Sequence, residues 1–426
     1  MYMLLVGLFV LLIFLGAPIA FVIGIISLIG ISTIPFIPNL TVFMKMFYGL
    51  NSFVLLAIPL FILAANLMNH GQITKMLVEF CIALVGNVRG GLAHANILVS
   101  MIFAGVSGSS QADTAGVGKM LIPAMIETGY DKETAVGVTA ASSTIGVIIP
   151  PSIPMVVYSG LTNASVAALF MGGMIPGILV GLSMMLIVAV ISKRKNFPVY
   201  ERANRKHIWC LFKKSFPALL TPIIIVGGIS TGLYTPTEAA AFASIYAMFI
   251  SLFWYKTLKL KDMPCILKET LELSSLSLIA LATASALGEL LGYYKVSESV
   301  ALFFASYISS PYVFMLVIIL FFLFIGTFMD AIPAMILFIP VILPVALRLG
   351  ISPIHLGIVT VMTLAVGLVT PPYGLCLLIA SSIADLSIER SLMGVLPYIA
   401  ALMIILLLVA MIPSIAFYIP HLLGLV

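Results

Sequence analysis

The sequence predicts an all-α polytopic membrane protein built from two inverted repeats. Three observations support this prediction: an extreme apolar composition, an internal duplication at a constant spacing, and an uneven distribution of basic residues. Hydrophobic residues occupy 62% of the 426 positions and charged residues only 8%, far from the balance of a soluble domain. Each spanning helix needs roughly 20 apolar residues, so the chain has room for about nine to twelve crossings. No separate soluble catalytic or nucleotide-binding domain fits beside them.

The duplication joins a stretch from Gly105 to Pro151 to a second stretch from Gly326 to Pro372. A constant offset of 221 positions carries Gly105 onto Gly326, Pro123 onto Pro344, Gly129 onto Gly350, Gly146 onto Gly367, and Pro150 and Pro151 onto Pro371 and Pro372. An offset without gaps indicates an internal repeat. Paired Gly and Pro residues inside apolar segments are typical of broken membrane helices that line a polar cavity.

The remaining apolar segments supply the crossings. We predict full crossings at about 4–30, 51–69, 133–158, 165–191, 216–231, 237–255, 270–292, 353–380 and 395–418. Gly, Ser and Asp interrupt the segments near 92–128 and 312–348, so each is predicted to be a re-entrant hairpin that enters and leaves one face. Shorter connecting helices are predicted near 74–88 and 296–309. The first apolar run has no basic n-region and exceeds a signal-peptide core, so we expect a retained helix.

Basic segments set the orientation. Ser192–Lys214 holds eight Lys or Arg residues and Lys256–Lys268 holds four, so both are expected in the cytoplasm. Tracing nine crossings from these segments puts the N-terminus inside and the C-terminus outside. The same trace makes 133–158 and 353–380 run in opposite directions, which means that the repeats are inverted. The predicted organisation is a first repeat at 1–191, a basic cytoplasmic loop and linking helix at 192–236, and a second repeat at 237–426.

Oxygen-rich breaks in both repeats suggest cation binding. Gly105–Ser110 and Ser143–Ser152 offer hydroxyl groups and carbonyls that Pro150 and Pro151 free from helical bonding. Thr327 and Thr370 supply hydroxyl oxygens in the second repeat. Uncharged oxygen ligands suit Na+ better than a transition metal, so we predict two related Na+ sites. The plain alternative is that Gly and Ser merely allow close helix packing.

Few residues inside the apolar segments are ionisable. Asp330 lies within the second hairpin, where a carboxylate is costly and marks a functional site by default; contact with substrate, contact with a cation and capping of a helix all remain open. Asp113 is expected to cap the turn after the first hairpin tip. Glu289 suits a subunit contact or a transport role equally. The four scattered cysteines are expected to be inert packing residues, and the net charge of +5 reflects topology, with no nucleic-acid partner.

An enzymatic function is an alternative, because Gly105–Gly108 spells a GxSG motif that resembles the nucleophile motif of rhomboid intramembrane serine proteases. That chemistry needs a His to activate the serine. His94 lies upstream, contrary to the expected chain order, and Phe328 occupies the position equivalent to Ser107. Zinc-protease and phosphate-loop motifs are absent from the sequence. We therefore expect no enzymatic activity.

Five motifs together resemble the large membrane subunit of tripartite ATP-independent periplasmic (TRAP) transporters. They are Ser107–Gly118, Ile149–Met155, Gly232–Ala241, Gly326–Ala334 and Thr370–Leu375. The resemblance spans essentially the whole chain. It implies an elevator-type secondary transporter in the bacterial inner membrane that imports an organic acid with a Na+ gradient. It also implies two partners, a periplasmic substrate-binding protein and a separate four-helix membrane subunit.

The resemblance further assigns residues to sites. It places ion ligands at Ser107, Gly108, Gly146, Ile149 and Pro151 in the first repeat, and at Gly326, Thr327, Gly367 and Thr370 in the second. Substrate contacts are expected at Ser109, Ser110, Ser152 and Asp330. The family transports sialic acid, C4-dicarboxylates and other acids, and a hydroxyl-rich site with one Asp favours sialic acid. The alternative function is a Na+-coupled anion symporter that works without partners.

Overall fold

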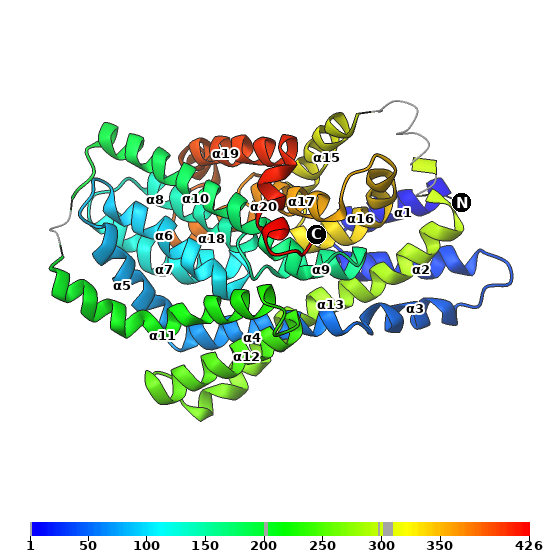
Figure 1. Cartoon of the computed structure of the whole chain (residues 1–426). Helices are drawn as coiled ribbons and strands as arrows, with labels where there is room; N and C mark the ends of the chain where they lie inside the picture. Colours follow the sequence, from blue (N-terminus) through cyan, green and yellow to red (C-terminus); the bar gives the residue numbers. More distant parts are fainter. Residues whose placement is uncertain (1, 200–202, 297–298, 301–309) are drawn as a thin grey trace.

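A computed structural model describes residues 2–199, 203–296, 299–300 and 310–426, and every regular element in them is helical (Figure 1). The helices of the first half are α1 (Tyr2–Phe14), α2 (Ile19–Ser32), α3 (Leu40–Leu50), α4 (Ala57–His70), α5 (Ile73–Val85), α6 (Gly91–Ser107), α7 (Ser110–Glu127), α8 (Lys132–Ser143), α9 (Ile153–Thr162) and α10 (Val166–Lys195). Those of the second half are α11 (Arg205–Ser230), α12 (Pro236–Phe249), α13 (Met263–Tyr293), α15 (Pro311–Gly326), α16 (Ala331–Arg348), α17 (Pro353–Gly367), α18 (Leu375–Ala384), α19 (Ile388–Met411) and α20 (Pro413–Leu422). Short 3-10 or π turns lie at Phe53–Leu56, Thr144–Val147, Ile250–Trp254 and Leu260–Asp262.

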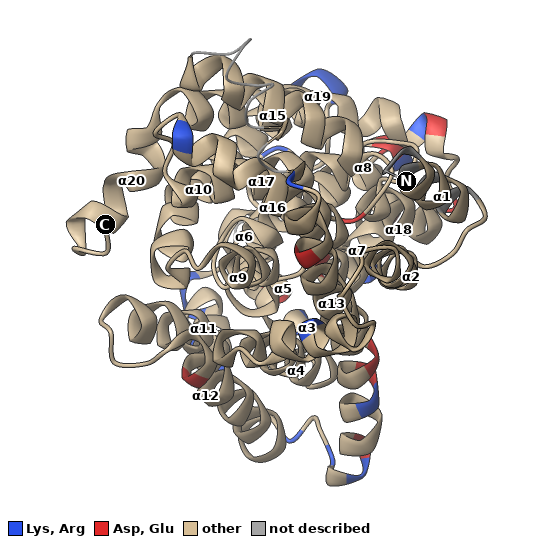
Figure 2. Ribbon diagram, turned by 90° about the vertical axis from the view of Figure 1, so that its right-hand side faces the viewer, with Lys and Arg blue, Asp and Glu red and all other residues tan. Residues whose placement is uncertain are grey.

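Seven helices among the described residues are long and apolar enough to cross a membrane. They are Phe53–His70, Val166–Lys195, Arg205–Ser230, Pro236–Trp254, Leu260–Tyr293, Ala331–Arg348 and Ile388–Met411. Charged residues are sparse along the ribbons (Figure 2). The predicted all-α membrane fold is confirmed. The connecting helix predicted near 296–309 lies almost wholly outside the described residues.

The first 50 residues differ from the prediction. The expected crossing at 4–30 is two helices, because Gly16 adopts a positive φ of 78° after α1 and Pro18 precedes α2. Each helix has at most 14 residues, which reaches about 21 Å and not the roughly 30 Å of a hydrocarbon core. The N-terminus also lies at the end of the molecule opposite the link between α10 and α11 (Figure 1). The trace that put the N-terminus on the side of the basic segments assumed a single crossing here, which these two helices do not form, so the side of the N-terminus stays a prediction.

The basic segment is more helical than predicted. Helix α10 continues to Lys195 and α11 already begins at Arg205, so most of the expected loop extends two long helices. Three basic residues in the last turn of α10 interact favourably with the helix dipole. At the start of α11, the Asn204 side chain accepts a hydrogen bond from the Lys206 N–H at 3.1 Å. Lys and Arg are good helix formers where a helix projects into water. The number of basic residues therefore does not distinguish an exposed helix end from a loop.

The duplication is present in three dimensions. Helices α7 and α16 match residue for residue at the offset of 221, and the glycines that follow them, Gly129 and Gly350, both have positive φ. Each repeat also has a cis bond within its Pro-Pro pair. The predicted crossings at 133–158 and 353–380 are broken helices, α8–α9 and α17–α18. In Figure 1 the first runs from left to right and the second from right to left, so the repeats are inverted as predicted.

The two repeats interlock. The second arm of each hairpin packs on the second half of the other repeat's broken helix, α7 on α18 and α16 on α9. Tyr158 of α9 is fully buried and donates a hydrogen bond to the Pro353 carbonyl at the start of α17, at 2.7 Å. A second body lies beside this core. In it, α13 packs against α2, α3 and α4, and α4 also packs against α12.

Two single acidic residues have local roles. Glu238 forms a capping box with Thr235 at the start of α12. Glu289 on α13 forms an ion pair with Lys45 on α3, with Nζ and Oε2 2.9 Å apart. This pair stabilises the contact between α3 and α13, and the two alternatives for Glu289, a subunit contact and a role in transport, stay predictions.

Candidate functional site

A cavity of about 180 Å³ lies where the two hairpin tips meet. Its walls combine the first tip, the second tip and two helices of the neighbouring body, α4 and α13. The polar residues that line it are Asn66, Ser107, Ser109, Ser110, Gln111, Ser277 and Asp330. Residues of both hairpin tips line it, so the cavity joins the two repeats.

Asp330 connects the two tips. Its Oδ1 accepts a hydrogen bond from the Ala331 N–H at 2.8 Å, which makes it the N-cap of α16. Its Oδ2 accepts from Gln111 Nε2 of the other hairpin at 3.1 Å. The capping role that the sequence left open is therefore occupied, while the second oxygen lies at the cavity wall. Gln111 was missed, although an amide beside a Ser-rich break is itself a signal.

The first tip holds a compact polar turn. Ser109 is the N-cap of α7, and its hydroxyl accepts from the Ala112 N–H at 3.4 Å. The backbone N–H groups of Ser110 and Gln111 have no acceptor among the described residues. Free N–H groups at a helix start favour an anion, because they add to the positive end of the helix dipole.

Asp113 is not the cap that we predicted. Ser109 takes that role, and Asp113 lies one turn into α7, fully buried, with Oδ1 accepting from the Ser107 hydroxyl. Asp113 Oδ2 and the Ser110 hydroxyl have no hydrogen-bond partner among the described residues. A buried carboxylate with one oxygen unpartnered is costly unless it is protonated or neutralised by a cation. The equivalent position in the second repeat is Ala334, a difference that could have marked Asp113 in the sequence.

The first predicted ion site gathers around this carboxylate. A methyl group on Gly146 would lie 2.3 Å from Asp113 Oδ2, and one on Gly108 would lie 2.8 Å from the Pro151 carbonyl oxygen. The Gly108 carbonyl accepts from the Ile153 N–H at 3.3 Å. Ile149 lies in the same break, with its side chain against α10. The structure thus brings Ser107, Gly108, Gly146 and Pro151 together, and neither glycine position has room for a side chain.

The second predicted ion site is a close backbone contact. A methyl group on Gly367 would lie 2.8 Å from the backbone of Gly326. The Thr327 carbonyl accepts from the Tyr373 N–H at 2.9 Å. The hydroxyls of Thr327 and Thr370 donate within their own chain segments, at 2.7 and 2.8 Å. Each hydroxyl therefore keeps lone pairs that could face a cation.

The predicted substrate contacts divide into two groups. Ser109, Ser110 and Asp330 line the cavity. Ser152 does not, because it is fully buried as the N-cap of α9. Its hydroxyl donates to the Val147 carbonyl at 2.6 Å and accepts from the Met155 N–H at 3.3 Å. These bonds give Ser152 a structural role in holding the break of the first repeat.

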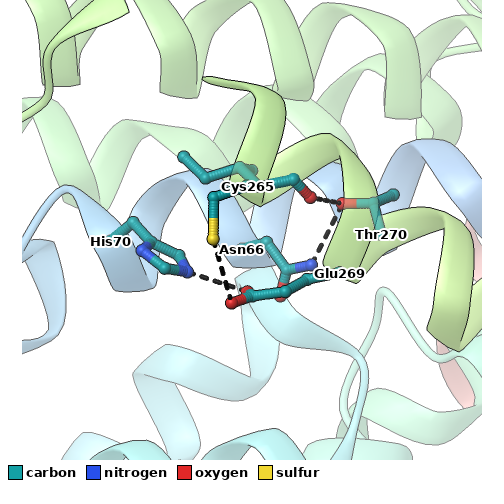
Figure 3. Close-up of polar contacts among 6 residues, drawn as sticks. Asn66, His70, Cys265, Glu269 and Thr270 are labelled. Carbon is teal, nitrogen blue, oxygen red and sulfur yellow. Dashed lines mark hydrogen bonds and ion pairs between the residues drawn. The ribbon is translucent and has the colours of Figure 1, made fainter. Parts of the chain in front are cut away.

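Polar contacts between α4 and α13 hold the opposite wall (Figure 3). Asn66 lines the cavity and donates from Nδ2 to the Thr270 hydroxyl at 3.0 Å. One turn further, His70 Nε2 lies 2.8 Å from Glu269 Oε2. Asn66 was missed by the sequence reasoning, which concentrated on the repeat; an amide within an apolar helix was the available signal.

The charge of the cavity is unbalanced. Asp330 is its one ionisable wall residue in the described part of the chain, and no Lys, Arg or His accompanies it. Within that same part, no group of three His, Cys, Asp or Glu side chains is arranged to hold a metal ion. The arrangement offers hydroxyls, amides, backbone N–H groups and a carboxylate, which suits binding of a polar solute.

Comparison with known proteins decides the family. Residues 6–415 match the family model described as "Tripartite ATP-independent periplasmic transporter, DctM component". The chain belongs to this family. This match confirms the resemblance found in the sequence. As a TRAP large permease, the chain is the large component of a tripartite system that also has a substrate-binding protein and a small subunit.

Relatives of the TRAP large permease carry different substrate names. The sialic acid TRAP transporter large permease protein SiaM of Vibrio cholerae is 38% identical over 89% of this chain and 88% of its own. The C4-dicarboxylate TRAP transporter large permease protein DctM of Pseudomonas aeruginosa is 36% identical over 89% of each. The YdaH transporter of Alcanivorax borkumensis, whose crystal structure reveals an unusual topology, has a TM-score of 0.61 over 87% of this chain and 86% of its own, at 14% identity. That last similarity supports the fold alone.

The permease geometry also disfavours the protease alternative. Ser107 donates to Asp113, and His94 lies 13 residues earlier on the same helix, about 20 Å along its axis. A His at that distance does not activate the Ser107 hydroxyl. The named relatives are permeases.

Proposed function

We propose that this permease imports an organic acid by coupling it to Na+ entry, with the substrate held in the cavity between the hairpin tips. The observation that carries the proposal is the charge of the cavity: among the described residues, its wall presents hydroxyls, amides and free N–H groups but no basic side chain. A carboxylate substrate beside Asp330 needs positive charge from another source. Bound cations next to the tips and the N-terminus of α7 would supply it.

Two Na+ ions would occupy the breaks of the two repeats. The first would use oxygens from Ser107, Gly108, Gly146, Ile149 and Pro151, and the second oxygens from Gly326, Thr327, Gly367 and Thr370. The unpartnered Oδ2 of Asp113 lies beside Gly146 and supports a cation near the first site. Hard oxygen donors are the ligands that Na+ prefers over softer metals.

The chemistry of the cavity favours sialic acid over a C4-dicarboxylate. Gln111, Asn66 and the Ser109 and Ser110 hydroxyls offer many hydrogen bonds to a polyhydroxylated, amide-bearing acid. A second carboxylate near Asp330 would add like-charge repulsion. Named relatives of both substrate classes are similarly identical to this chain, so the discrimination rests on the cavity chemistry.

Transport would proceed by an elevator motion. The hairpins and broken helices form one interlocked core, and the cavity lies at its boundary with α4 and α13. We propose that this core moves against the α4–α13 body in the bacterial inner membrane, with the basic ends of α10 and α11 in the cytoplasm. A separate four-helix membrane subunit would join that body, and a periplasmic binding protein would deliver the substrate.

Uptake into proteoliposomes tests the proposal. The chain, its small subunit and its binding protein are reconstituted together, and uptake of labelled sialic acid and succinate is measured with and without an inward Na+ gradient. We expect sialic acid uptake only with all three components and Na+. Uptake by this chain alone would favour the stand-alone symporter, and equal uptake with K+ in place of Na+ would overturn the coupling.

A further inference from the structure

A groove of about 880 Å³ lies away from the transport cavity, between the end of α5, the start of α6 and the last turns of α10. Its long wall is apolar and belongs to α10, where Leu182 and Leu186 are 50% and 70% exposed. Its far end is basic, with Arg89, His94 and Lys193 together. These elements lie at the left end of the molecule in Figure 1.

The basic end has no acidic partner. No Asp or Glu lines the groove, and Arg89, His94 and Lys193 form no ion pair within the described part of the chain. The nearby Lys195 differs, since its Nζ lies 2.8 Å from Asp131 Oδ2. Uncompensated basic groups beside an apolar wall favour a ligand that has an anionic head and a hydrocarbon body.

The groove is fixed by the backbone and has a suitable length. Gly90 has a positive φ of 76°, and a methyl group on it would lie 1.9 Å from the Ser192 hydroxyl oxygen. The segment before α6 therefore packs tightly against α10 and closes the groove at its basic end. From Lys193 to Leu182 the groove follows eleven residues of α10, about 16 Å, which matches one leaflet of a hydrocarbon core of roughly 30 Å.

We propose that this groove binds an anionic phospholipid, with its phosphate at Arg89, His94 and Lys193 and an acyl chain along Leu186 and Leu182. The lipid belongs to the leaflet on the side of the basic helix ends. It links α5 and the α6–α7 hairpin to α10. The inference rests on membrane insertion, which the family membership supports, and not on Na+ coupling.

Native mass spectrometry of the permease with its small subunit tests the lipid. Phosphatidylglycerol is titrated against phosphatidylethanolamine of the same chain length. The double variant Arg89→Ser/Lys193→Ser should weaken phosphatidylglycerol binding by about 30-fold, since each basic residue near a membrane surface contributes about one kcal/mol. The matched control, Arg205→Ser/Lys206→Ser at the exposed start of α11, removes the same charge and should change binding less than about twofold. Equal loss in both variants would overturn the site.

Two further measurements separate the occupants. Ala189→Trp fills the apolar wall without changing charge, and it should weaken both lipids while gel filtration shows an intact complex. Inorganic phosphate at millimolar concentration should not displace phosphatidylglycerol; displacement would overturn the proposal in favour of a free anion. Efficient cross-linking of Leu186→Cys to the small subunit would also overturn it, because a protein helix would then cover the groove.

Discussion

The two hairpin tips share one backbone design but differ in chemistry. Ser109 and Asp330 occupy equivalent positions at the offset of 221, and each is the N-cap of the second hairpin helix. Behind the cap the tips diverge: Ser107 and Asp113 form a buried polar pair in the first, where the second has Phe328 and Ala334. The first tip therefore carries its carboxylate inside the protein and the second carries it at the cavity wall.

This difference explains how a duplicated fold serves an asymmetric task. Helix breaks and caps depend on backbone geometry, which the duplication copied. A charge inside the membrane needs a specific partner. The two carboxylates have different surroundings, because Asp113 is buried within the protein and Asp330 lines the cavity. We infer that the buried Asp113 acts on a cation, whereas Asp330 acts on the solute.

The largest effect is expected at Asp113. Asp113→Asn keeps the bond with Ser107 but removes the negative charge, so Na+-driven uptake should fall by about 100-fold, the scale of losing a buried charge partner. Glu127→Gln, at the far end of α7, is the control and should leave uptake unchanged. Proteoliposome uptake over a series of Na+ concentrations measures both. An unaltered Na+ dependence in Asp113→Asn would remove the distinction between the tips.

A second large effect is expected at the Gly326–Gly367 contact. Gly367→Ala places a methyl group 2.8 Å from the Gly326 backbone, so the second tip must shift and Na+ affinity should fall by at least about tenfold. Gly288→Ala on α13 is the control, because nothing lies within 4 Å of the added methyl group. Thermal unfolding of both variants, with and without Na+, checks this. Equal Na+ stabilisation of Gly367→Ala and the unmodified protein would contradict the prediction.

Exchanging the caps tests the solute side. Asp330→Ser gives the second tip the cap of the first, so α16 keeps a capping oxygen while the cavity loses its charge. We expect half-saturating substrate concentration to rise about tenfold, the scale of one charged hydrogen bond, with little change in melting temperature. Asp330→Ala should add a loss of about 1 kcal/mol in stability. If Asp330→Ser lowers only the melting temperature, the residue is purely a cap.

The smallest effect is expected at Thr370. Its hydroxyl donates to the Val366 carbonyl at 2.8 Å, so Thr370→Ala removes the proposed oxygen ligand and this one intrahelical bond. Half-saturating Na+ should rise about three- to tenfold, in line with one lost polar contact. Thr128→Ala removes a similar intrahelical bond to the Ala124 carbonyl, far from the tips, and should have no effect. Identical Na+ dependence in the two variants would argue against Thr370 as a ligand.

The sequence alone determined the fold class and the duplication, because apolar composition and Gly-Pro register are local properties of the chain. It also determined the inversion, because the basic segments orient the crossings next to them. It also located the tips, since a break in a membrane helix must carry residues that tolerate one. That Ser109 and not Asp113 caps α7 was beyond it, because a shift of one helical turn decides whether a side chain caps the helix or lies buried.

Tertiary structure decided the rest. Asn66, Gln111 and Ser277 are single polar residues in separate helices, and only packing brings them to the cavity of Asp330. Ser152 looked equivalent to the other serines until burial gave it a structural role. The first predicted crossing is split into α1 and α2 at Gly16 and Pro18. A hydropathy pattern does not include the tendency of these two residues to end a helix. Contacts between distant segments depend on side-chain shape and direction, which the order of residues does not display.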